Sequence, residues 1–383
     1  MRRHLAGKIF VLIEIILSVL FLVAVKRSGI LPDHYFMALL AVLSVLAIFN
    51  MLLQFLKSKI FILGVILSIL ISVLSGIGTV AVQSAVQLMD QISDLDYQTD
   101  NMVAVVRADD PAEELSDIAN YRFGIQNGSD TENTEKMIAD IEEKLGREIK
   151  VQEYPNIQEE AEALLSGRIE AAVYNDAFTS ILEEYVEDYV SQIKVIYQYG
   201  VETPVETVQG EAQDVQQPFN VYVSGIDVDG PISTTSRSDV NIIVSVNPHE
   251  HKILLTTTPR DYYVTIPGIS GEQRDKLTHA GIYGVNKSIE TLENLYDIDI
   301  SYYVRVNFTS VVKIVDALGG VDVDSPYAFT TTHGNYEIKQ GMNHLNGEMA
   351  LGFARERYSF SSGDNQRGKN QEILLEALIN KAM

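Results

Sequence analysis

The stretch VNIIVSVNPHEHKILLTTTPRD, Val240–Asp261, decides the fold of the second half of this chain. Its two apolar runs are rich in β-branched residues and are separated by a short polar segment around Pro248, which predicts two strands joined by a turn. His249 and His251 lie in that turn. Their spacing differs from that of the two zinc-binding histidines in an HExxH helix, so we expect exposed surface histidines.

Similar apolar runs lie on both sides of this stretch. FNVYVSGID at Phe219–Asp227 and YYVRVNF at Tyr302–Phe308 predict two further strands. Helical patterns follow at Gly284–Tyr296, Thr309–Leu318, Gly347–Leu351 and Asn370–Ala382. Strands mixed with helices of this length predict an α/β domain over residues 219–383.

A second α/β unit is predicted over residues 98–200. MVAVVRA, YRFGIQN, EIKVQEY and IEAAVYN are typical of strands, and TENTEKMIADIEEKLG and IQEEAEALLSG are typical of helices that end at Gly146 and Gly167. We interpret the acidic residues Glu159, Glu160 and Glu162 as one solvated helix face. Residues 201–218 are polar and punctuated by Pro and Gly, so we predict a linker between the two units.

The first quarter of the chain predicts a membrane region over residues 9–89. Ile9–Val25, Tyr35–Leu56 and Ile60–Val82 are apolar runs of 17, 22 and 23 residues, long enough to span a bilayer as helices. Glu14 is the one charged residue within them. We expect it near the membrane interface, without a functional role, although an intramembrane carboxyl can mark a site.

The placement of Lys and Arg predicts the orientation of these spans. Five basic residues lie before the first span or between the second and third, against two on the opposite side. This asymmetry favours a cytoplasmic tail at residues 1–8 and extracytoplasmic C-terminal domains, and so a multi-pass protein of the cell membrane.

The charge of the chain excludes one class of partner. The formal net charge is −23, and residues 90–383 contain 50 acidic and 22 basic residues. Affinity for nucleic acid comes largely from neutralisation of its phosphates, so we expect no nucleic-acid binding. The chain has no cysteine, which excludes disulfides and thiolate chemistry.

Three arginines stand close together in GFARERYSFSSGDNQR, namely Arg355, Arg357 and Arg367. The planar guanidinium group can donate two parallel hydrogen bonds to a phosphate, so a phosphate or pyrophosphate site is one interpretation. Solvated arginines, or partners for the acidic residues Glu356 and Asp364, are the alternative. Alternation around Arg355 and Arg357 favours a strand, in which both side chains would project to one face as a clamp.

Further charged residues follow or precede the predicted strands. Carboxylates and arginines at strand ends of an α/β fold commonly form ligand sites. Carboxylate oxygens also suit magnesium, which takes one or two of them together with phosphate oxygens and water. The sequence contains neither a GxxxxGK[ST] phosphate loop nor a GxSxG nucleophile elbow. The residues concerned are Asp227, Asp229, Arg237, Asp239, Arg260 and Asp261.

The C-terminal domain, residues 219–383, resembles the LytR–CpsA–Psr family at these positions. The matching stretches keep the order and spacing of the family's motifs, and the three spans with an acidic accessory unit look like its capsule-type streptococcal members. The stretches are GID at Gly225–Asp227, SRSD at Ser236–Asp239, PRD at Pro259–Asp261, DKLTHA at Asp275–Ala280, ALGGVDVDSP at Ala317–Pro326, HLNGEMALGFARER at His344–Arg357 and GDNQR at Gly363–Arg367.

The resemblance implies an α/β/α sandwich with a mixed sheet and a magnesium-dependent phosphotransferase. Such an enzyme moves capsular polysaccharide or another glycopolymer from undecaprenyl-pyrophosphate to peptidoglycan, and an apolar groove holds the polyprenyl tail. The aliphatic face of Val311–Leu318 is a candidate wall of that groove. Other capsule assembly proteins are possible partners in this interpretation.

The resemblance also implies residue roles. The pyrophosphate would contact Arg237, Arg260, Arg355, Arg357 and Arg367. The metal would be held or oriented by Asp227 and Asp239. Catalysis would rest on Asp239, Arg237 and Arg260, with Asp239 accepting the proton of the acceptor hydroxyl and Arg260 alternatively orienting Asp239.

Two features depart from the family pattern. Many members carry a second basic residue three positions after Arg367, where this chain has Asn370, so one phosphate contact is absent or is supplied by Lys369. The chain ends at Met383 within an apparent amphipathic helix, whereas related proteins often continue, which leaves a C-terminal truncation as an alternative.

Two other functions remain as alternatives to the transferase. One is a non-catalytic protein that binds lipid-linked polymer or forms the scaffold of a capsule assembly complex, as the accessory unit and the three spans suggest. The other is a lipid pyrophosphatase that transfers to water.

Overall fold

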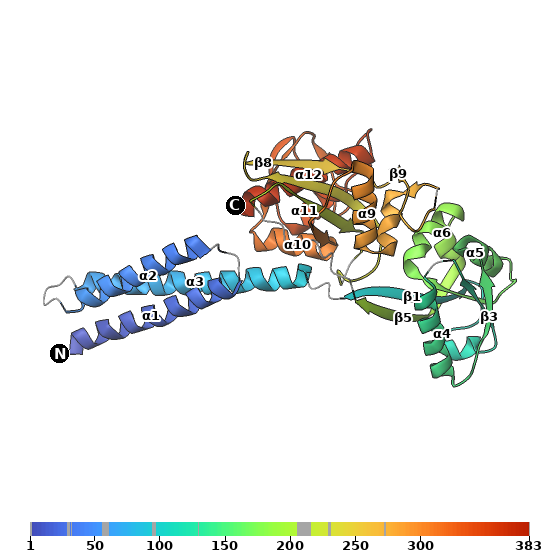
Figure 1. Ribbon diagram of the computed structural model, residues 1–383, viewed down its shortest axis with the longest axis horizontal. Coiled ribbons are helices and arrows are strands. Elements are labelled where there is room, and N and C mark those ends of the chain that lie inside the picture. Colours follow the sequence, from blue (N-terminus) through green and yellow to red (C-terminus); the bar gives the residue numbers. More distant parts are fainter. Residues whose placement is uncertain are drawn as a thin grey trace. The chain divides into compact units, whose positions relative to one another are not determined.

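The structure is a computed structural model, and it describes residues 2–28, 31, 33–55, 61–93, 97–128, 130–204, 216–228, 231–271 and 273–382. The chain divides into two compact units, Met1–Gln91 and Ile92–Met383. Figure 1 shows long helices in the first unit and α/β architecture in the second.

The first unit contains the three apolar helices that the sequence predicts. They are α1 (Arg2–Ser28), α2 (Asp33–Leu53) and α3 (Phe61–Ser93). Within them Gly7–Ser28, His34–Leu53 and Phe61–Ser84 are long and apolar enough to cross a membrane. At 1.5 Å per residue each span reaches about 30 Å or more, the thickness of a hydrocarbon core.

Glu14, which the sequence analysis expects near the membrane interface, is fully buried between helices. Asn50 of α2 donates from Nδ2 to both carboxylate oxygens of Glu14, at 3.1 and 3.0 Å. A carboxyl group on the apolar side of a span would have no hydrogen-bond donor, so it faces the neighbouring helix that supplies one.

The second unit begins with a five-stranded sheet in the order β3-β2-β4-β1-β5. Four strands are predicted by the sequence: β1 (Tyr97–Arg107), β2 (Arg122–Gln126), β3 (Lys150–Tyr154) and β4 (Ala171–Asn175). Parallel β2–β3 and β2–β4 pairs are combined with antiparallel pairs of β1 with β4 and β5.

The fifth strand, β5 (Ile193–Pro204), was not predicted, and it extends the sheet into residues assigned to the linker. It pairs with β1 along its length (Figure 1). Apolar residues at every second position, Val195, Tyr197, Tyr199 and Val201, are the signal that could have revealed it. Gly200 and Pro204 are typical of loops, so this segment was assigned in part to the linker. Residues 205–215 of the predicted linker lie outside the described residues.

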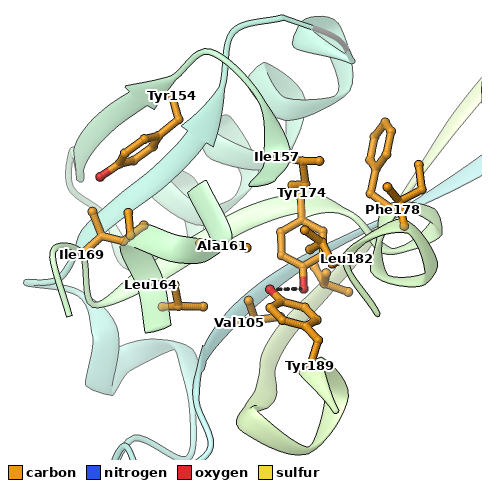
Figure 2. Close-up of a cluster of buried hydrophobic side chains, with 14 of the residues drawn as sticks. Val105, Tyr154, Ile157, Ala161, Leu164, Ile169, Tyr174, Phe178, Leu182 and Tyr189 are labelled. Carbon is orange, nitrogen blue, oxygen red and sulfur yellow. Dashed lines mark hydrogen bonds between the residues drawn. The ribbon is translucent and has the colours of Figure 1, made fainter. Parts of the chain in front are cut away.

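Helices cover both faces of this sheet. On one face Val103 and Val105 pack with α5 (Ile157–Leu165) and α6 (Thr179–Tyr185), and Figure 2 shows this core around the hydrogen-bonded pair Tyr174 and Tyr189. On the other face Met102 and Ala104 pack against α4 (Thr131–Leu145), which ends at the left-handed Gly146 as predicted. Short helical turns at Leu115–Ile118, Asp176–Phe178 and Tyr189–Gln192 complete the domain.

Glu160 contradicts the prediction of a solvated helix face. Glu159 and Glu162 are exposed, but Glu160 is fully buried. It lies one turn from Ile157 and Leu164, which face the core, so helical geometry turns it inward with them. Its Oε1 accepts a hydrogen bond from Val173 N at 3.2 Å, and burial raises its pKa well above the ordinary value.

The C-terminal domain is built on a four-stranded sheet in the order β11-β6-β7-β8. The strands are β6 (Phe219–Ile226), β7 (Ser238–Asn247), β8 (Lys252–Thr257) and β11 (Tyr302–Val306). Because β6 and β11 are parallel and the other pairs antiparallel, the sheet is mixed, as predicted. His249 and His251 are exposed in the β7–β8 turn.

The two faces of this sheet have different partners. Tyr222 and Ile243 pack in a core with α9 (Val285–Tyr296). Val223, Ile242 and Val304 occupy neighbouring positions across the strands on the opposite face, toward α10 (Phe308–Ala317) and α12 (Asp364–Ala382). A sheet between helices on both faces is the predicted α/β/α arrangement.

The remaining elements are short. They are β9 (Tyr263–Val264), β10 (Asp275–Lys276), α8 (Leu277–Ala280), a helical turn at Gly281–Tyr283, β12 (Val321–Ser325), β13 (Phe329–Thr330), β14 (Glu337–Ile338) and β15 (Gly341–Leu345).

The predicted strand around Arg355 and Arg357 is wrong. The helix α11 (Gly347–Arg355) continues to Arg355, and Glu356 then leaves it with extended backbone. Asn346 caps this helix by accepting a hydrogen bond from Met349 N at 3.0 Å. Four consecutive residues, Ala350–Phe353, are buried, so this segment lacks the alternating burial of a strand with one exposed face.

Candidate functional site

One cavity of about 500 Å³ is lined by seven of the charged side chains that the sequence selected for the site. It lies in the C-terminal domain, between the open face of the sheet and the helices α10, α11 and α12. The selected residues that line it are Asp227, Arg237, Asp239, Arg260, Arg355, Arg357 and Arg367. Asp261 is not among them, and it lies 3.7 Å from Arg260 Nε instead. Asp229 lies outside the described residues.

The topology of the sheet explains this convergence. Asp227 directly follows β6, and Arg260 follows β8 by three residues. Asp239 lies at the start of β7, which runs antiparallel to both. The carboxyl ends of β6 and β8 and the amino end of β7 therefore meet at one edge of the sheet, where ligand sites of α/β folds commonly form.

Asp239 is held on both sides of its carboxylate. Arg260 donates from Nη1 to Asp239 Oδ2 at 2.6 Å, and Thr278 donates from Oγ1 to Oδ1 at 2.8 Å. The Arg260 and Asp239 side chains are 15% and 10% exposed, so the ion pair is largely shielded from water. The arrangement fixes one orientation of Asp239, and Thr278 is a residue of the site that the sequence did not single out.

Arg355 lies between an acidic and an aromatic partner. Its Nη2 is 3.7 Å from Asp227 Oδ1, and its guanidinium carbon lies 3.9 Å from the centre of the Phe308 ring. Such cation–π stacking orients the guanidinium plane without occupying its hydrogen-bond donors. Arg355 therefore keeps N–H groups for an anion in the cavity.

Glu356 explains why Arg355 and Arg357 line one cavity without forming a strand. It is 2% exposed and accepts hydrogen bonds from Thr332 N at 2.5 Å and from Ser359 N at 2.9 Å. Burial raises the pKa of Glu356, but the backbone and side-chain hydrogen bonds of Thr332 and Ser359 together hold the pKa below its ordinary value. The anchored carboxylate fixes the turn from which the two arginines project.

The sequence analysis left open that the arginines pair with Glu356 or Asp364. Of the three, Arg367 does so. Arg367 Nη2 lies 2.5 Å from Asp364 Oδ1, one turn earlier in α12. Glu356 instead bonds to Thr332 and Ser359, as described above. Arg357 donates to Tyr358 Oη at 2.6 Å and lies over the Tyr358 ring, so it too is oriented by a neighbour.

The two aspartates fit a magnesium ion only as part of a larger ligand set. Among the described residues no group of three or more His, Asp or Glu side chains is placed to hold a metal. Magnesium commonly takes one or two protein carboxylates and completes its shell with phosphate oxygens and water. Asp227 and Asp239 line one cavity and could supply those carboxylates.

Away from the sheet edge the cavity becomes an apolar groove. The sheet contributes Val223, Ile242 and Val304, α10 contributes Val311 and Ile314, and α12 contributes Leu374, Leu375 and Leu378. The predicted wall Val311–Leu318 supplies two of these residues, whereas Val315 is buried in the core instead. The cavity thus joins a cationic end to an aliphatic end.

The departures from the family pattern have structural outcomes. Asn370 is fully buried, donates from Nδ2 to Phe353 O at 3.2 Å and accepts from Gln366 Nε2 at 3.0 Å. It ties α12 to α11 instead of facing the cavity. Lys369 is exposed and is not part of the cavity wall, so the prediction that it supplies the contact has no support in this geometry.

Comparison with known proteins agrees with this site. The model of the LytR_cpsA_psr family matches residues 184–383, just over half of the chain. The chain belongs to the LytR–CpsA–Psr family. This match includes every residue of the cavity wall.

Named relatives belong to the same family of proteins. A polyisoprenyl-teichoic acid–peptidoglycan teichoic acid transferase TagU of Enterococcus faecalis is 36% identical over 171 residues, 44% of this chain and 55% of the relative. The TagU of Oceanobacillus iheyensis is 37% identical over 171 residues, 43% and 51% of the two chains. The chain spans about half the length of these curated relatives.

Similar solved structures include TagV of B. subtilis, with 33% identity, a TM-score of 0.40 and coverage of 43% of this chain and 65% of that one. Another is the LytR-CPS2A-psr family protein YwtF (TagT) with bound octaprenyl pyrophosphate lipid, with 33% identity, a TM-score of 0.38 and coverage of 45% and 68%.

A second family model, that of a DNA polymerase processivity factor, matches residues 56–174. The match covers under a third of the chain and includes the apolar helix α3. Residues 98–200 contain 23 acidic and eight basic residues. Such a composition repels the phosphates of nucleic acid, so we infer no function from this match.

Proposed function

We propose that this protein is a membrane-anchored phosphotransferase that attaches a glycopolymer, such as capsular polysaccharide, from undecaprenyl-pyrophosphate to peptidoglycan. One observation carries the proposal: five arginines and two aspartates gather at one end of a cavity whose other end is aliphatic. A pyrophosphate joined to a polyprenyl chain has the same division into an anionic and an apolar part. The names of the TagU relatives support the same class of reaction.

The proposed chemistry breaks one phosphoanhydride bond. The acceptor hydroxyl oxygen attacks the phosphorus that carries the polymer, the bond to the lipid-side phosphate breaks, and undecaprenyl phosphate leaves. Asp239 accepts the proton of the attacking hydroxyl. Arg355, Arg357 and Arg367 stabilise the negative charge that develops on the phosphate oxygens, which is the main requirement of phosphoryl transfer.

Arg260 orients Asp239 in this proposal. Its 2.6 Å hydrogen bond to Asp239 Oδ2 commits one Nη atom to that role, which favours the alternative over a purely phosphate-binding Arg260. Arg237 lines the cavity beside Asp239 and is free to contact the pyrophosphate in the same proposal.

Magnesium would be held by Asp227 and Asp239. Bound there, the ion would neutralise charge on the pyrophosphate. The proposed setting is extracytoplasmic, because five of the seven basic residues around the spans lie on the side of the N-terminal tail. The membrane, the lipid-linked polymer and peptidoglycan are then its partners.

The test is transfer by the full chain in detergent, with a synthetic undecaprenyl-pyrophosphate-linked oligosaccharide, peptidoglycan and magnesium. Wild type should attach the oligosaccharide to peptidoglycan, and Asp239→Asn should lower the rate about a hundredfold, the usual contribution of a general base. Tight binding of the lipid-linked oligosaccharide without transfer by wild type would favour a non-catalytic scaffold and reject the proposal.

A further inference from the structure

The strongest unexplained feature is the contact between the accessory domain (Tyr97–Pro204) and the edge of the sheet that forms the site. Both lie within the single compact unit Ile92–Met383. Residues Asp275–Tyr283, named here the connecting segment, make part of this contact. The segment consists of β10, α8 and one helical turn.

On one side the connecting segment holds two residues of the site. Thr278 donates from Oγ1 to Asp239 Oδ1 at 2.8 Å and from its backbone N to Arg260 O at 2.9 Å. Leu277 donates from its backbone N to Tyr262 O at 2.8 Å. A shift of this segment would therefore move the partner of the proposed base and the backbone of Arg260 together.

The connecting segment also packs directly against the backbone around Arg237. A Cβ atom on Gly281 would lie 2.5 Å from Ser238 N and 2.9 Å from Ser236 O. Distances of this size leave no room for a side chain, so Gly281 allows the closest approach of the two backbones. The segment thus touches the chain on both sides of Arg237.

On its other side the connecting segment enters the core of the accessory domain. Ile282 is 4% exposed and belongs to the hydrophobic cluster that contains Tyr174 and Leu182. The Tyr283 ring packs edge-on against Phe178, with 6.1 Å between the ring centres. These contacts make the end of the segment a part of the accessory domain's packing.

One charged residue of the accessory domain fixes the middle of the segment. Glu184 in α6 binds Lys276, with 2.7 Å between Oε2 and Nζ, and its Oε1 lies 3.8 Å from His279 Nε2. His279 in turn bonds from Nδ1 to Asp275 Oδ1 at 2.8 Å. Glu184 therefore faces residues two before and one after Thr278.

A separate contact holds the approach to Arg237. Thr99 of β1 donates from N to Ser233 O and accepts at O from Thr235 N, both at 2.8 Å. The accessory domain consequently contacts two segments that carry residues of the site. One leads to Arg237 and Asp239, and the other is the connecting segment with Thr278. A spacer that only separated the membrane from the site would not need contacts at these two places.

We propose that the accessory domain is a positioning part of the catalytic site, and that Glu184 acts through the connecting segment to hold Thr278 against Asp239. This inference rests on the proposed transferase function and extends it. Glu184 is a positioning residue, because it acts through its ion pair with Lys276. An ion pair with both side chains about one third exposed adds little to stability, so the expected effect is on the geometry of the site.

The experiment compares wild type, Glu184→Gln and the control Glu183→Gln in the full chain. Glu183 is an exposed neighbour on α6, and the ion pairs of Lys276 are with Glu184 and Asp261. Glu184→Gln should lower kcat about three- to tenfold and leave KM for the lipid-linked oligosaccharide unchanged, because the groove and the arginines of α11 and α12 lie elsewhere. Glu183→Gln should match wild type.

A double-mutant cycle with Thr278→Val separates positioning from general destabilisation. If Glu184 acts through Thr278, the double variant should be no slower than Thr278→Val alone. Hydrogen exchange of the peptide at residues 236–241 gives a readout that needs no activity, and it should become faster in Glu184→Gln. Equal kcat for Glu184→Gln and wild type, or losses that multiply in the double variant, would overturn the inference.

Failure of this inference can be distinguished from failure of the proposed function. If wild type transfers no oligosaccharide, the transferase proposal fails, and the exchange measurement still decides whether Glu184 controls the backbone beside Asp239. Unchanged exchange at residues 236–241 would then reject the inference as well.

Discussion

Glu356 in the C-terminal domain and Glu160 in the accessory domain are both buried carboxyl groups, with 2% and 0% exposure, but their pKa values move in opposite directions. Glu356 accepts hydrogen bonds from two backbone N–H groups, and its pKa is lowered. Glu160 accepts one, at 3.2 Å, while its Oε2 has no partner among the described residues, and its pKa is raised. The pKa of a carboxyl group therefore depends on the hydrogen-bond donors around it as well as on its burial.

The same contrast separates the two domains at a larger scale. Charged residues of the C-terminal domain face one another across a cavity and are oriented by partners, as Asp239 is by Arg260 and Thr278. In the accessory domain Asp130 instead bonds to Asn175 and Asn133 within the fold. The first arrangement leaves donors free for a ligand, and the second satisfies the protein itself.

The largest effect is expected from Arg355→Ala. Loss of the guanidinium group removes a charge placed at the cationic end of the cavity, so transfer should fall at least a hundredfold. The measurement is the transfer rate of the full chain, with Arg147→Ala as an exposed control in the accessory domain. Arg355→Ala with a rate within threefold of wild type would remove Arg355 from the proposed site.

The apolar end of the cavity is tested by Leu375→Asp. A carboxylate in the groove would have to lose water to accommodate a polyprenyl chain, so affinity for undecaprenyl pyrophosphate should fall about tenfold or more. Affinity for inorganic pyrophosphate should not change, because it occupies the cationic end. Leu375→Met conserves the volume and should bind like wild type. Equal losses for both ligands would show that the groove does not hold the lipid.

Glu356→Gln should destabilise the C-terminal domain by about 1–3 kcal/mol at pH 7, because an amide cannot accept hydrogen bonds from both backbone N–H groups at once. The folded pKa of Glu356 is lowered, so its contribution is present above the unfolded pKa and is lost as the pH falls through the folded pKa. Chemical denaturation between pH 3 and 7 should show the gap to wild type closing in acid. A gap independent of pH would contradict this account.

Glu160→Gln should show the opposite pH dependence. The folded pKa is raised, so the stabilising contribution of Glu160 is present below its unfolded pKa and is lost as the pH rises through the folded value. The variant should match wild type in acid and become the more stable of the two as the pH rises. The exposed Glu162→Gln is the control. A variant less stable than wild type at every pH would indicate an ionised, satisfied Glu160.

A pH dependence of stability is also expected from Asp130. Burial and the nearby Asp100 raise the pKa of Asp130 to about 6. Its contribution to stability should therefore decline between about pH 4 and pH 6, with a slope of at most about 1.4 kcal/mol per pH unit, and stay constant above. Asp130→Asn should remove this decline in chemical denaturation. A decline of equal slope in the variant would assign it to another group.

Much of this molecule could be predicted from local sequence. Apolar runs of β-branched residues gave β6, β7 and β8, and the glycine after a periodic segment gave the end of α4. Asp227, Asp239 and Arg260 lie at or near strand ends, so the predicted strands were enough to select them as candidates before their distances were known. Their catalytic and metal-binding roles stay predictions.

The features that the sequence analysis predicted wrongly or missed depend on tertiary contacts. Alternation around Arg355 favoured a strand, but the burial of Ala350 and Phe353 against the core selects a helix. Thr278 carries no local signal for its bond to Asp239, since 39 residues separate the two. Glu160 was expected at the surface because charge usually lies there, whereas a backbone donor from β4 holds it inside.

We expect the residues of this cavity to break the phosphoanhydride bond of the lipid pyrophosphate only when an acceptor hydroxyl is present. The most direct measurement is mass spectrometry of the lipid product from the full chain, with the undecaprenyl-pyrophosphate-linked oligosaccharide, with and without peptidoglycan. The account predicts undecaprenyl phosphate in the presence of peptidoglycan, little without it, and little in either case for Asp239→Asn. Equal release without peptidoglycan would show a pyrophosphatase, and no release by wild type would show a binding protein; either result would contradict the account.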